Sequence, residues 1–233
     1  MRIIFLGDSL TRGNIGVSYL DLLKQKLPNH ELYNFGKNGD PVVSLYKRMK
    51  KIQYPKNIDT AFVWIGTNDV FVKVNNRFPV IKKILGQTWT ENHEEFKDYY
   101  RKILDFLKYK TGKIFTVSPW IIGEDFDNIW NKELDELSII IKNISKSYDN
   151  VEFIDIKKLV VEKIEPQKSS DYIVDNSFNV IFDALTLNSS KRIDKKALDR
   201  GLFLTMDGVH LNSRSACFIA DVLYDHIVKE MDL

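Results

Sequence analysis

A serine, a histidine and an aspartate, the side chains that together perform nucleophilic acyl transfer, stand near the two ends of this 233-residue sequence. Ser9 follows the apolar run at 2–6, and Asp207 precedes His210 by three positions. A serine hydroxyl becomes an effective nucleophile when a base takes its proton, and an acid that orients the base completes the set. We therefore hypothesise that Ser9 is a nucleophile, that His210 is its base and that Asp207 orients His210.

The sequence position of His210 distinguishes it from the other histidines. They precede a predicted strand, open a predicted helix or lie within one: His30, His93 and His226. His210 instead follows a short glycine-containing turn, which lets the Asp207 carboxylate reach back to the imidazole Nδ1. Simpler roles stay open at this point, because Asp207 could close a local turn and Asp8-Ser9 could cap a helix.

Two loops offer hydrogen-bond donors for the negative charge that acyl transfer builds on a carbonyl oxygen. The loop at 36–40 (Gly-Lys-Asn-Gly-Asp) offers glycine backbone N–H groups, and the loop at 66–69 (Gly-Thr-Asn-Asp) offers the side-chain amide of Asn68. Each loop taken alone is an ordinary turn. Together with the motifs at Ser9 and His210, they follow three successive predicted strands and precede the last predicted helix, and chance alone does not explain this order.

The elements that must position these residues alternate between strand and helix. Apolar strands are predicted at 2–6, 31–35, 60–65, 113–118 and 151–156. Amphipathic helices are predicted near 15–27, 41–52, 91–110, 129–147 and 213–230. This alternation predicts an α/β fold with a parallel sheet and helices on both faces, whose ligand sites collect at the carboxyl ends of the strands.

Two stretches do not fit the alternation and are interpreted as insertions into a single domain that spans 1–233. One lies near 70–90 and carries several aromatic residues. The other, at 157–204, is rich in lysine and aspartate, and helices are expected within it at 157–165, 175–188 and 191–200. A chain of this length buries one substantial core and does not require a second domain.

The composition argues against several other classes of protein. The 34 basic and 32 acidic residues leave a net charge of +2, which gives no electrostatic reason to expect a nucleic-acid partner. The one cysteine, Cys217, excludes an intrachain disulfide and is predicted to be a small core residue. No apolar run approaches the roughly 20 residues of a membrane span, and no signal peptide is visible, so we expect a cytoplasmic location.

Four motifs occur in order: Gly7-Asp8-Ser9-Leu10, Gly39-Asp40, Gly66-Thr67-Asn68-Asp69 and Asp207-Gly208-Val209-His210. With them the chain resembles the SGNH hydrolase superfamily, also called GDSL-type esterases and lipases, over nearly its whole length. The resemblance implies a three-layer α/β/α flavodoxin-like sandwich with about five parallel strands. It also implies a Ser9 nucleophile, a His210 base oriented by Asp207, and oxyanion donors from the Ser9 N–H, the Gly39 N–H and the Asn68 side chain. In place of the proline that often follows the family histidine, Asn212 is expected to cap the last helix.

The residues and the resemblance together predict a serine esterase or acylhydrolase that cleaves carboxylic esters through an acyl-enzyme, without a metal or an organic cofactor. The expected substrates are small-molecule esters with a short acyl group, and O-acetyl carbohydrates are candidates, because no long apolar channel is evident. Aromatic residues of 70–90 and 120–130 (Trp120, Phe126, Trp130) line the pocket, form a lid over it or pack in the core. An O-acyltransferase with the same site and a non-catalytic ligand-binding module remain alternatives, and the sequence does not indicate an oligomeric state.

Overall fold

The structure is a computed structural model that describes residues 1–164, 169–174, 177–187 and 189–231. Within these residues five parallel strands form one sheet in the order β2-β1-β3-β4-β5. The strands are β1 (Arg2–Gly7), β2 (Glu31–Gly36), β3 (Ile58–Trp64), β4 (Thr111–Val117) and β5 (Val151–Ile154). The prediction of a parallel α/β sheet from the alternation of apolar strands and amphipathic helices is confirmed.

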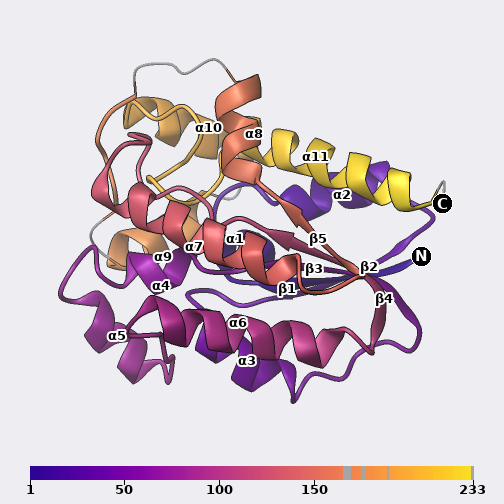
Figure 1. The fold of residues 1–233 in the computed structure, drawn as a ribbon. Coiled ribbons are helices and arrows are strands. Elements are labelled where there is room, and N and C mark those ends of the chain that lie inside the picture. Colours follow the sequence, from indigo (N-terminus) through magenta and orange to yellow (C-terminus); the bar gives the residue numbers. More distant parts are fainter. Residues whose placement is uncertain (165–168, 175–176, 188, 232–233) are drawn as a thin grey trace.

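Helices cover both faces of the sheet, as Figure 1 shows. One face packs against α2 (Tyr19–Lys26), α8 (Ile156–Lys163) and α11 (Ser213–Met231). The other packs against α3 (Val42–Met49), α6 (His93–Leu107) and α7 (Ile129–Ser145). Successive side chains of a strand point to opposite faces, and in β1 Ile3 and Phe5 contribute to the first layer while Ile4 and Leu6 contribute to the second. All four are essentially buried, which explains why this strand is continuously apolar.

A row of aromatic rings crosses the middle of the sheet on the side of α2 and α11. Phe5, Phe62 and Phe115 are register partners on β1, β3 and β4. Their rings stack with centroid distances of 5.0 and 4.9 Å. Aromatic pairs add roughly 0.5–1.5 kcal/mol each beyond the area that they bury. This row therefore holds the three central strands in one register.

The carboxyl ends of the first three strands lie side by side. Gly7 at the end of β1 pairs with Gly36 of β2 and with Trp64 of β3. The chain after β1 enters the short helix α1 (Ser9–Arg12), and the chain after β3 enters α4 (Thr67–Phe71). In the sheet β1 lies between β2 and β3, so the connection after β1 runs toward one edge of the sheet and the connection after β3 runs toward the other edge. A crevice forms at this switch in strand order, where the loops after β1, β2 and β3 meet.

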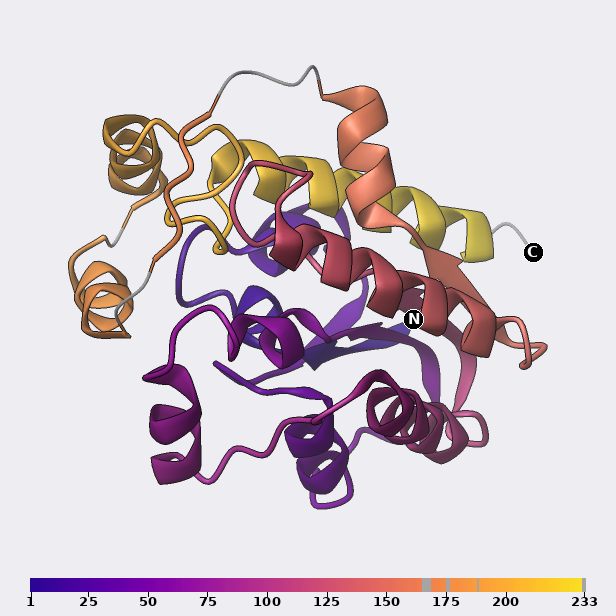
Figure 2. The ribbon, with the colours of Figure 1, turned by 60° about the vertical axis from the view of Figure 1, so that its left-hand side comes forward.

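The two predicted insertions contain helices of their own. The segment at 70–90 forms α5 (Phe78–Ile84), and the segment at 157–204 forms α8, α9 (Ser177–Thr186) and α10 (Ser190–Asp199). The three helices expected in the longer insertion are confirmed, although positions 165, 175, 176 and 188 of those predicted ranges lie outside the described residues. Figure 2 shows α5 and α9 at one end of the molecule, where both approach the carboxyl ends of the strands.

Two details differ from the sequence predictions. The first long helix begins at Tyr19 and not near 15, because the Ser18 hydroxyl accepts a hydrogen bond from the Asp21 N–H at 3.1 Å and caps the helix there. The prediction that Cys217 is a core residue is wrong, since its side chain is exposed. On α11 the core face contains Ala216, Ala220 and their helical neighbours, and Cys217 falls on the opposite face.

None of the helices in the described part of the chain combines the length and the apolar character that crossing a membrane would require.

Candidate active site

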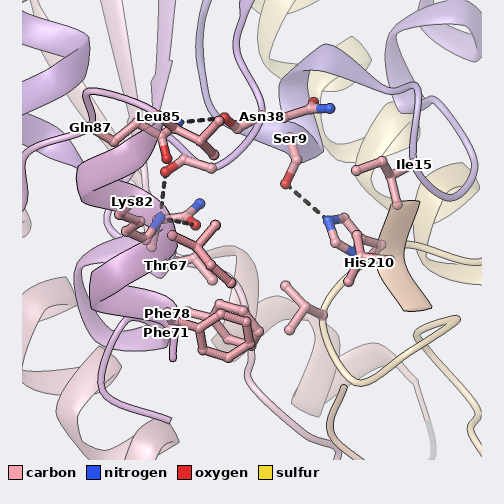
Figure 3. A pocket seen from close by; sticks show the side chains of 15 residues that line it. Ser9, Ile15, Asn38, Thr67, Phe71, Phe78, Lys82, Leu85, Gln87 and His210 are labelled. Carbon is pink, nitrogen blue, oxygen red and sulfur yellow. Dashed lines mark hydrogen bonds between the residues drawn. The ribbon is translucent and has the colours of Figure 1, made fainter. Parts of the chain in front are cut away.

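Ser9, His210 and Asp207 form one chain of hydrogen bonds. The Oγ of Ser9 lies 3.1 Å from Nε2 of His210, although the two residues are 201 positions apart in sequence. The other ring nitrogen, Nδ1, lies 2.7 Å from Oδ2 of Asp207. A carboxylate at Nδ1 favours the tautomer that carries its proton there, and Nε2 is then free to accept the serine proton. Figure 3 shows the hydroxyl of Ser9 directed at the imidazole of His210.

The serine owes its position to the way in which the chain leaves β1. Ser9 is the first residue of α1, and the Asp8 side chain caps this helix by accepting a hydrogen bond from the Leu10 N–H at 3.0 Å. Gly7 allows the helix to fold tightly back on the strand, since a Cβ at Gly7 would lie 2.2 Å from the Thr11 hydroxyl oxygen. The predicted capping role of Asp8-Ser9 and the position of Ser9 in the wall of the pocket therefore coexist.

The turn that carries His210 is closed by Asp207 itself. Its Oδ1 accepts hydrogen bonds from the backbone N–H groups of Val209 and His210 at 3.1 and 2.8 Å, so the local turn considered from sequence also forms. Gly208 has a φ of +89°, and a Cβ there would lie 2.6 Å from the Tyr172 carbonyl oxygen. A side chain at Gly208 would therefore be strained in both respects. Asn212 accepts a hydrogen bond from the Ser215 N–H at 3.2 Å, as expected for the cap of the last helix.

A buried carboxylate from another part of the chain holds the same turn from behind. Glu124, in the loop after β4, accepts hydrogen bonds from the backbone N–H groups of Phe203, Leu204 and Thr205 at 2.7, 2.8 and 2.7 Å. It also accepts a hydrogen bond from the Thr205 hydroxyl at 2.8 Å. Sequence reasoning did not identify Glu124, because an isolated acid in a loop carries no signal of a partner some eighty residues away.

The electrostatics of the pair favour a charged imidazole beside a carboxylate. Burial alone would lower the pKa of His210, but the charge of Asp207 and its hydrogen bond outweigh burial, and together with Asp8 and Asp183 they raise this pKa. Burial alone would raise the pKa of Asp207, but the charge and hydrogen bonds of His210 outweigh it and lower this pKa. The pair thus stabilises the imidazolium that forms whenever Nε2 takes a proton.

Three residues that line the pocket carry an available hydrogen-bond donor: Ser9, Gly39 and Asn68. Within the described residues, neither the Ser9 N–H nor the Gly39 N–H donates a hydrogen bond. The Asn68 amide donates one of its two hydrogens to Asp8 Oδ2 at 3.0 Å, which leaves the second hydrogen available. Ser9, Gly39, Asn68 and His210 all line one pocket. The structure thus brings together four of the five residues singled out from sequence, while Asp207 lies fully buried behind His210.

The glycine loop is fixed by polar contacts on its outer side. Gly39 has a φ of +73°, a conformation in which glycine carries no steric penalty. Asp40 forms a salt bridge with Arg48, which also donates to the Gly7 carbonyl oxygen at 2.8 Å. Gln87 donates to the Asn38 carbonyl oxygen at 2.7 Å. These contacts connect the ends of β1 and β2 and hold the Gly39 N–H at the edge of the pocket.

Three further aspartates near the site, Asp8, Asp40 and Asp69, are buried, and burial raises their pKa values. Burial raises the pKa of Asp8 to about 6 and that of Asp69 to about 7 against the hydrogen bonds and cations that lower them. Asp69 accepts hydrogen bonds from the Val42 N–H at 2.9 Å and from the Thr90 hydroxyl at 3.2 Å. It therefore joins the loop after β3 to the start of α3.

The pocket in front of Ser9 has a volume of about 210 Å³ and is lined mainly by apolar side chains. Figure 3 shows Phe71 and Phe78 on the side of the pocket that carries Lys82 and Leu85, across from His210, and their rings are tilted by 35° to each other. Four of the seven apolar residues in the wall come from the 70–90 segment, and the other three are Ile15, Val180 and Val209. The 70–90 insertion is thus part of the site.

The aromatic residues left open by the sequence divide between pocket and core. Phe71 and Phe78 line the pocket, whereas Trp120 is fully buried in the core. Phe126 packs against the core layer that contains Trp120, and Trp130 packs against the core layer on the other face of the sheet. Sequence reasoning also missed Lys82, which lines the pocket from α5. The described residues contain no group of three or more His, Cys, Asp or Glu side chains that could hold a metal ion.

A comparison with protein families matches residues 5–214 to the GDSL-like Lipase/Acylhydrolase family. This match contains all the residues of the hydrogen-bonded chain and the two loops that carry Gly39 and Asn68. None of the curated proteins compared with the chain matches it.

Solved structures resemble the chain in fold. An acetyl xylan esterase named AlAXEase is 23% identical with a TM-score of 0.65, and the match covers 97% of this chain and 100% of the other. The acetylxylan esterase Axe2 from Geobacillus stearothermophilus is 18% identical with a TM-score of 0.65 over 97% of this chain and 93% of its own. An α/β hydrolase from the metagenome of Lake Arreo, Spain, is 19% identical with a TM-score of 0.58 over 81% and 96%. Other structures of Axe2 are described as catalytic mutants, with alanine in place of a serine, an aspartate or a histidine.

Proposed function

Since the chain belongs to the GDSL-like Lipase/Acylhydrolase family and is a hydrolase of ester bonds, we propose that Ser9, His210 and Asp207 carry out the reaction and that the ester bears a short acyl group. The observation that carries this proposal is the continuous chain from Ser9 Oγ through both nitrogens of His210 to Asp207, at 3.1 and 2.7 Å. Catalytic hydrogen bonds of this kind have donor–acceptor distances of about 2.6–3.2 Å.

In the first half of the reaction, His210 Nε2 takes the Ser9 proton as Oγ attacks the carbonyl carbon of the ester. The carbonyl oxygen becomes an oxyanion, which accepts hydrogen bonds from the Ser9 N–H, the Gly39 N–H and the Asn68 amide. The carbon–oxygen bond to the alcohol then breaks, and the alcohol leaves with the proton held by His210. An acyl-enzyme at Ser9 remains.

In the second half, water takes the place of the alcohol. His210 accepts a proton from the water as its oxygen attacks the acyl-enzyme, and the same three donors hold the second oxyanion. Collapse releases the carboxylic acid and returns the proton to Ser9 Oγ. These steps need only groups of this chain and water. Asp207 stays ionised and keeps the imidazole in one orientation throughout.

O-acetyl carbohydrates are the substrate class that we propose within the short-chain esters. The similarity in fold to two acetyl xylan esterases supports it. A second groove, which shares Asn38, Leu85 and Gln87 with the pocket, also supports it. This groove includes Arg12, Asn14 and Lys37, whose exposed side chains form no hydrogen bond or salt bridge among the described residues. Such donors suit the hydroxyl groups of a sugar, while the apolar pocket suits the acyl group.

The test compares Ser9→Ala with Ser147→Ala, an exposed serine in the turn that follows α7. Both proteins are assayed with p-nitrophenyl acetate and with acetylated xylo-oligosaccharides, and both are treated with a fluorophosphonate, which labels only an activated serine. We expect Ser9→Ala to lose turnover and labelling with an unchanged circular dichroism spectrum, and Ser147→Ala to behave like the parent. Retained turnover in Ser9→Ala would refute the role of Ser9. Adding alcohols and measuring ester products separates hydrolysis from acyl transfer.

We also propose that residues 1–233 form one hydrolase domain, with the segments near 70–90 and 157–204 as insertions. The five-stranded sheet of the described residues, to which both halves of the chain contribute, supports this. The expected cytoplasmic location and the expected lack of a nucleic-acid partner stay predictions from the sequence.

A further inference from the structure

Lys82 is a buried lysine in the wall of the active-site pocket. It lies on α5, and only 6% of the residue is exposed. Its ammonium group donates a hydrogen bond to the Gly39 carbonyl oxygen at 2.6 Å and another to the Asn68 side-chain oxygen at 3.1 Å. Figure 3 shows both contacts at the tip of the side chain. Lys82 therefore bridges the loops after β2 and β3, which supply two of the three proposed oxyanion donors.

The partners of this ammonium group are unusual for a buried cation. Burying a charged amine is costly unless it is paired and hydrogen-bonded. Within the described residues Lys82 forms no salt bridge with a carboxylate, and the two acceptors that it contacts are neutral carbonyl groups. The nearby charges of Asp69, Asp8 and Asp40 act on it only at longer range. An ammonium needed merely to neutralise a carboxylate would contact that carboxylate directly.

The contact with Asn68 determines what the amide group can do. Its oxygen accepts from Lys82 and its nitrogen donates to Asp8, so the two ends of the amide cannot be exchanged without placing like groups against each other. One N–H of Asn68 then remains for the pocket. A cation at the amide oxygen also polarises the group and strengthens the hydrogen bond that this N–H donates.

The contact with Gly39 acts on the second donor. Gly39 has a φ of +73° and lines the same pocket as Asn68. Because glycine has more backbone freedom than other residues, holding the Gly39 carbonyl oxygen restricts the orientation of Gly39 and of its N–H. One ammonium group thus sets the positions of two donors that belong to different loops. Oxyanion donors accelerate a reaction because they are already oriented before charge develops.

We propose that Lys82 is a positioning residue of the oxyanion hole, which acts on the developing oxyanion through Asn68 and Gly39. The proposal rests on the proposed function of the site, in which those two groups bind the oxyanion. It assigns the 70–90 insertion a part in catalysis through one cation, in addition to its apolar contribution to the pocket wall.

A protonated Lys82 is required for this role. Burial lowers the pKa of Lys82 to about 8, against the opposing influence of Asp69, Asp8 and Asp40. The other charged groups of this region are Arg48, which pairs with Asp40, Lys37, whose charge also acts on Asp40, and His210, whose charge acts on Asp8. As the pH rises through about 8, Lys82 loses its proton while His210 is already a competent base. We therefore expect kcat to fall on the alkaline side because of Lys82.

The experiment compares Lys82→Met, Lys82→Arg and the control Lys83→Met, an exposed lysine next to it on the same helix. Each is assayed with p-nitrophenyl acetate from pH 6 to 9.5, with circular dichroism as a check of folding. Methionine keeps the length and apolar stem without charge, and arginine keeps a charge throughout this pH range. At pH 7 we expect Lys82→Met to lower kcat by roughly 10- to 100-fold with a much smaller change in KM, somewhat less than the loss of a whole donor. Lys82→Arg should recover part of kcat and lack the alkaline fall.

A kcat of Lys82→Met equal to that of Lys83→Met would overturn the proposal, as would an alkaline fall that persists unchanged in Lys82→Arg. If Lys82→Met does not fold, the pH dependence of kcat is measured on the unmodified protein instead. A fall in kcat near pH 8 would support the proposal, and a kcat that stays level from pH 7 to 9.5 would overturn it. The variant Ser9→Ala distinguishes failure of the proposed function from failure of the proposed role of Lys82. Activity retained without Ser9 defeats the proposed function, whereas an inactive Ser9→Ala with a fully active Lys82→Met defeats only the role of Lys82.

Discussion

The carboxylate of Glu124 accepts two hydrogen bonds from Thr205, one from its backbone N–H at 2.7 Å and one from its hydroxyl at 2.8 Å. Thr205 lies two residues before Asp207, in the loop that carries the acid and the imidazole. Glu124 lies in the loop that directly follows strand β4 of the sheet. The histidine loop, which contains no strand of the sheet, is thereby tied to the scaffold that positions Ser9.

Glu124→Gln should loosen this connection. Both carboxylate oxygens accept backbone N–H groups, so a glutamine would set its own NH₂ against a buried donor. Leaving such a donor unsatisfied costs roughly 1–3 kcal/mol. We expect the free energy of unfolding in urea to fall by about that amount, and kcat to fall with it as Asp207 and His210 lose their position. Glu91→Gln, an exposed residue, is the matched control, and equal stabilities of the two variants would contradict this role.

Asn68→Ala should lower kcat by roughly 10²–10³ if its amide binds the oxyanion, because this is the usual effect of losing one such donor. KM for p-nitrophenyl acetate should change much less, since the oxyanion exists only beyond the ground state. The exposed Asn76 is the control, as Asn76→Ala removes the same atoms away from the pocket. A kcat of Asn68→Ala within twofold of the control would remove Asn68 from the oxyanion hole.

The rate should fall on the acid side with an apparent pKa above the ordinary histidine value of about 6.5. Asp207 raises the pKa of His210 despite burial, and only the neutral imidazole can accept the Ser9 proton. Activity is therefore full above the raised pKa and is lost as the pH falls through it. The measurement is kcat/KM for a neutral ester from pH 4.5 to 8. An acid limb well below pH 6.5 would indicate that another group limits the reaction.

The five residues proposed from sequence owe their recognition to local motifs at strand ends. Strand register makes such motifs informative, because Gly7, Gly36 and Trp64 are paired and the loops that follow them must meet. Lys82 and Glu124 offered no comparable signal. Lys82 is one of two adjacent lysines on the short helix α5, and its burial depends on how α5 packs against two distant loops. The prediction for Cys217 was wrong for a related reason, since its apolar neighbours did not reveal which face of α11 packs against the sheet.

Asp69→Asn should flatten the pH dependence of stability between about pH 4 and pH 7. Burial raises the pKa of Asp69 to about 7 in the folded protein from 3.8, so the folded state binds a proton that the unfolded state has released. The free energy of unfolding therefore falls as the pH rises across this window, by at most a few kcal/mol. Asparagine can accept from the Val42 N–H and donate to the Thr90 oxygen without titrating. Urea unfolding at pH 5 and 7.5 measures the difference, and an identical pH dependence in Asp69→Asn and the parent would contradict the raised pKa.

Phe78→Ala should shift the preference of the enzyme toward longer acyl groups. Phe78 lines the pocket in front of Ser9, and its ring packs against that of Phe71 with a centroid distance of 4.6 Å. Removing the ring enlarges the apolar space beside the nucleophile, so a hexanoyl chain gains contacts that an acetyl group cannot make. Single methylene groups in such pockets change specificity by roughly 10–200-fold. We expect the ratio of kcat/KM for p-nitrophenyl hexanoate to that for the acetate to rise at least about tenfold. Phe106→Ala, on α6 away from the pocket, controls for lost core packing and should leave the ratio unchanged. An unchanged ratio in Phe78→Ala would show that the acyl group binds elsewhere in the crevice.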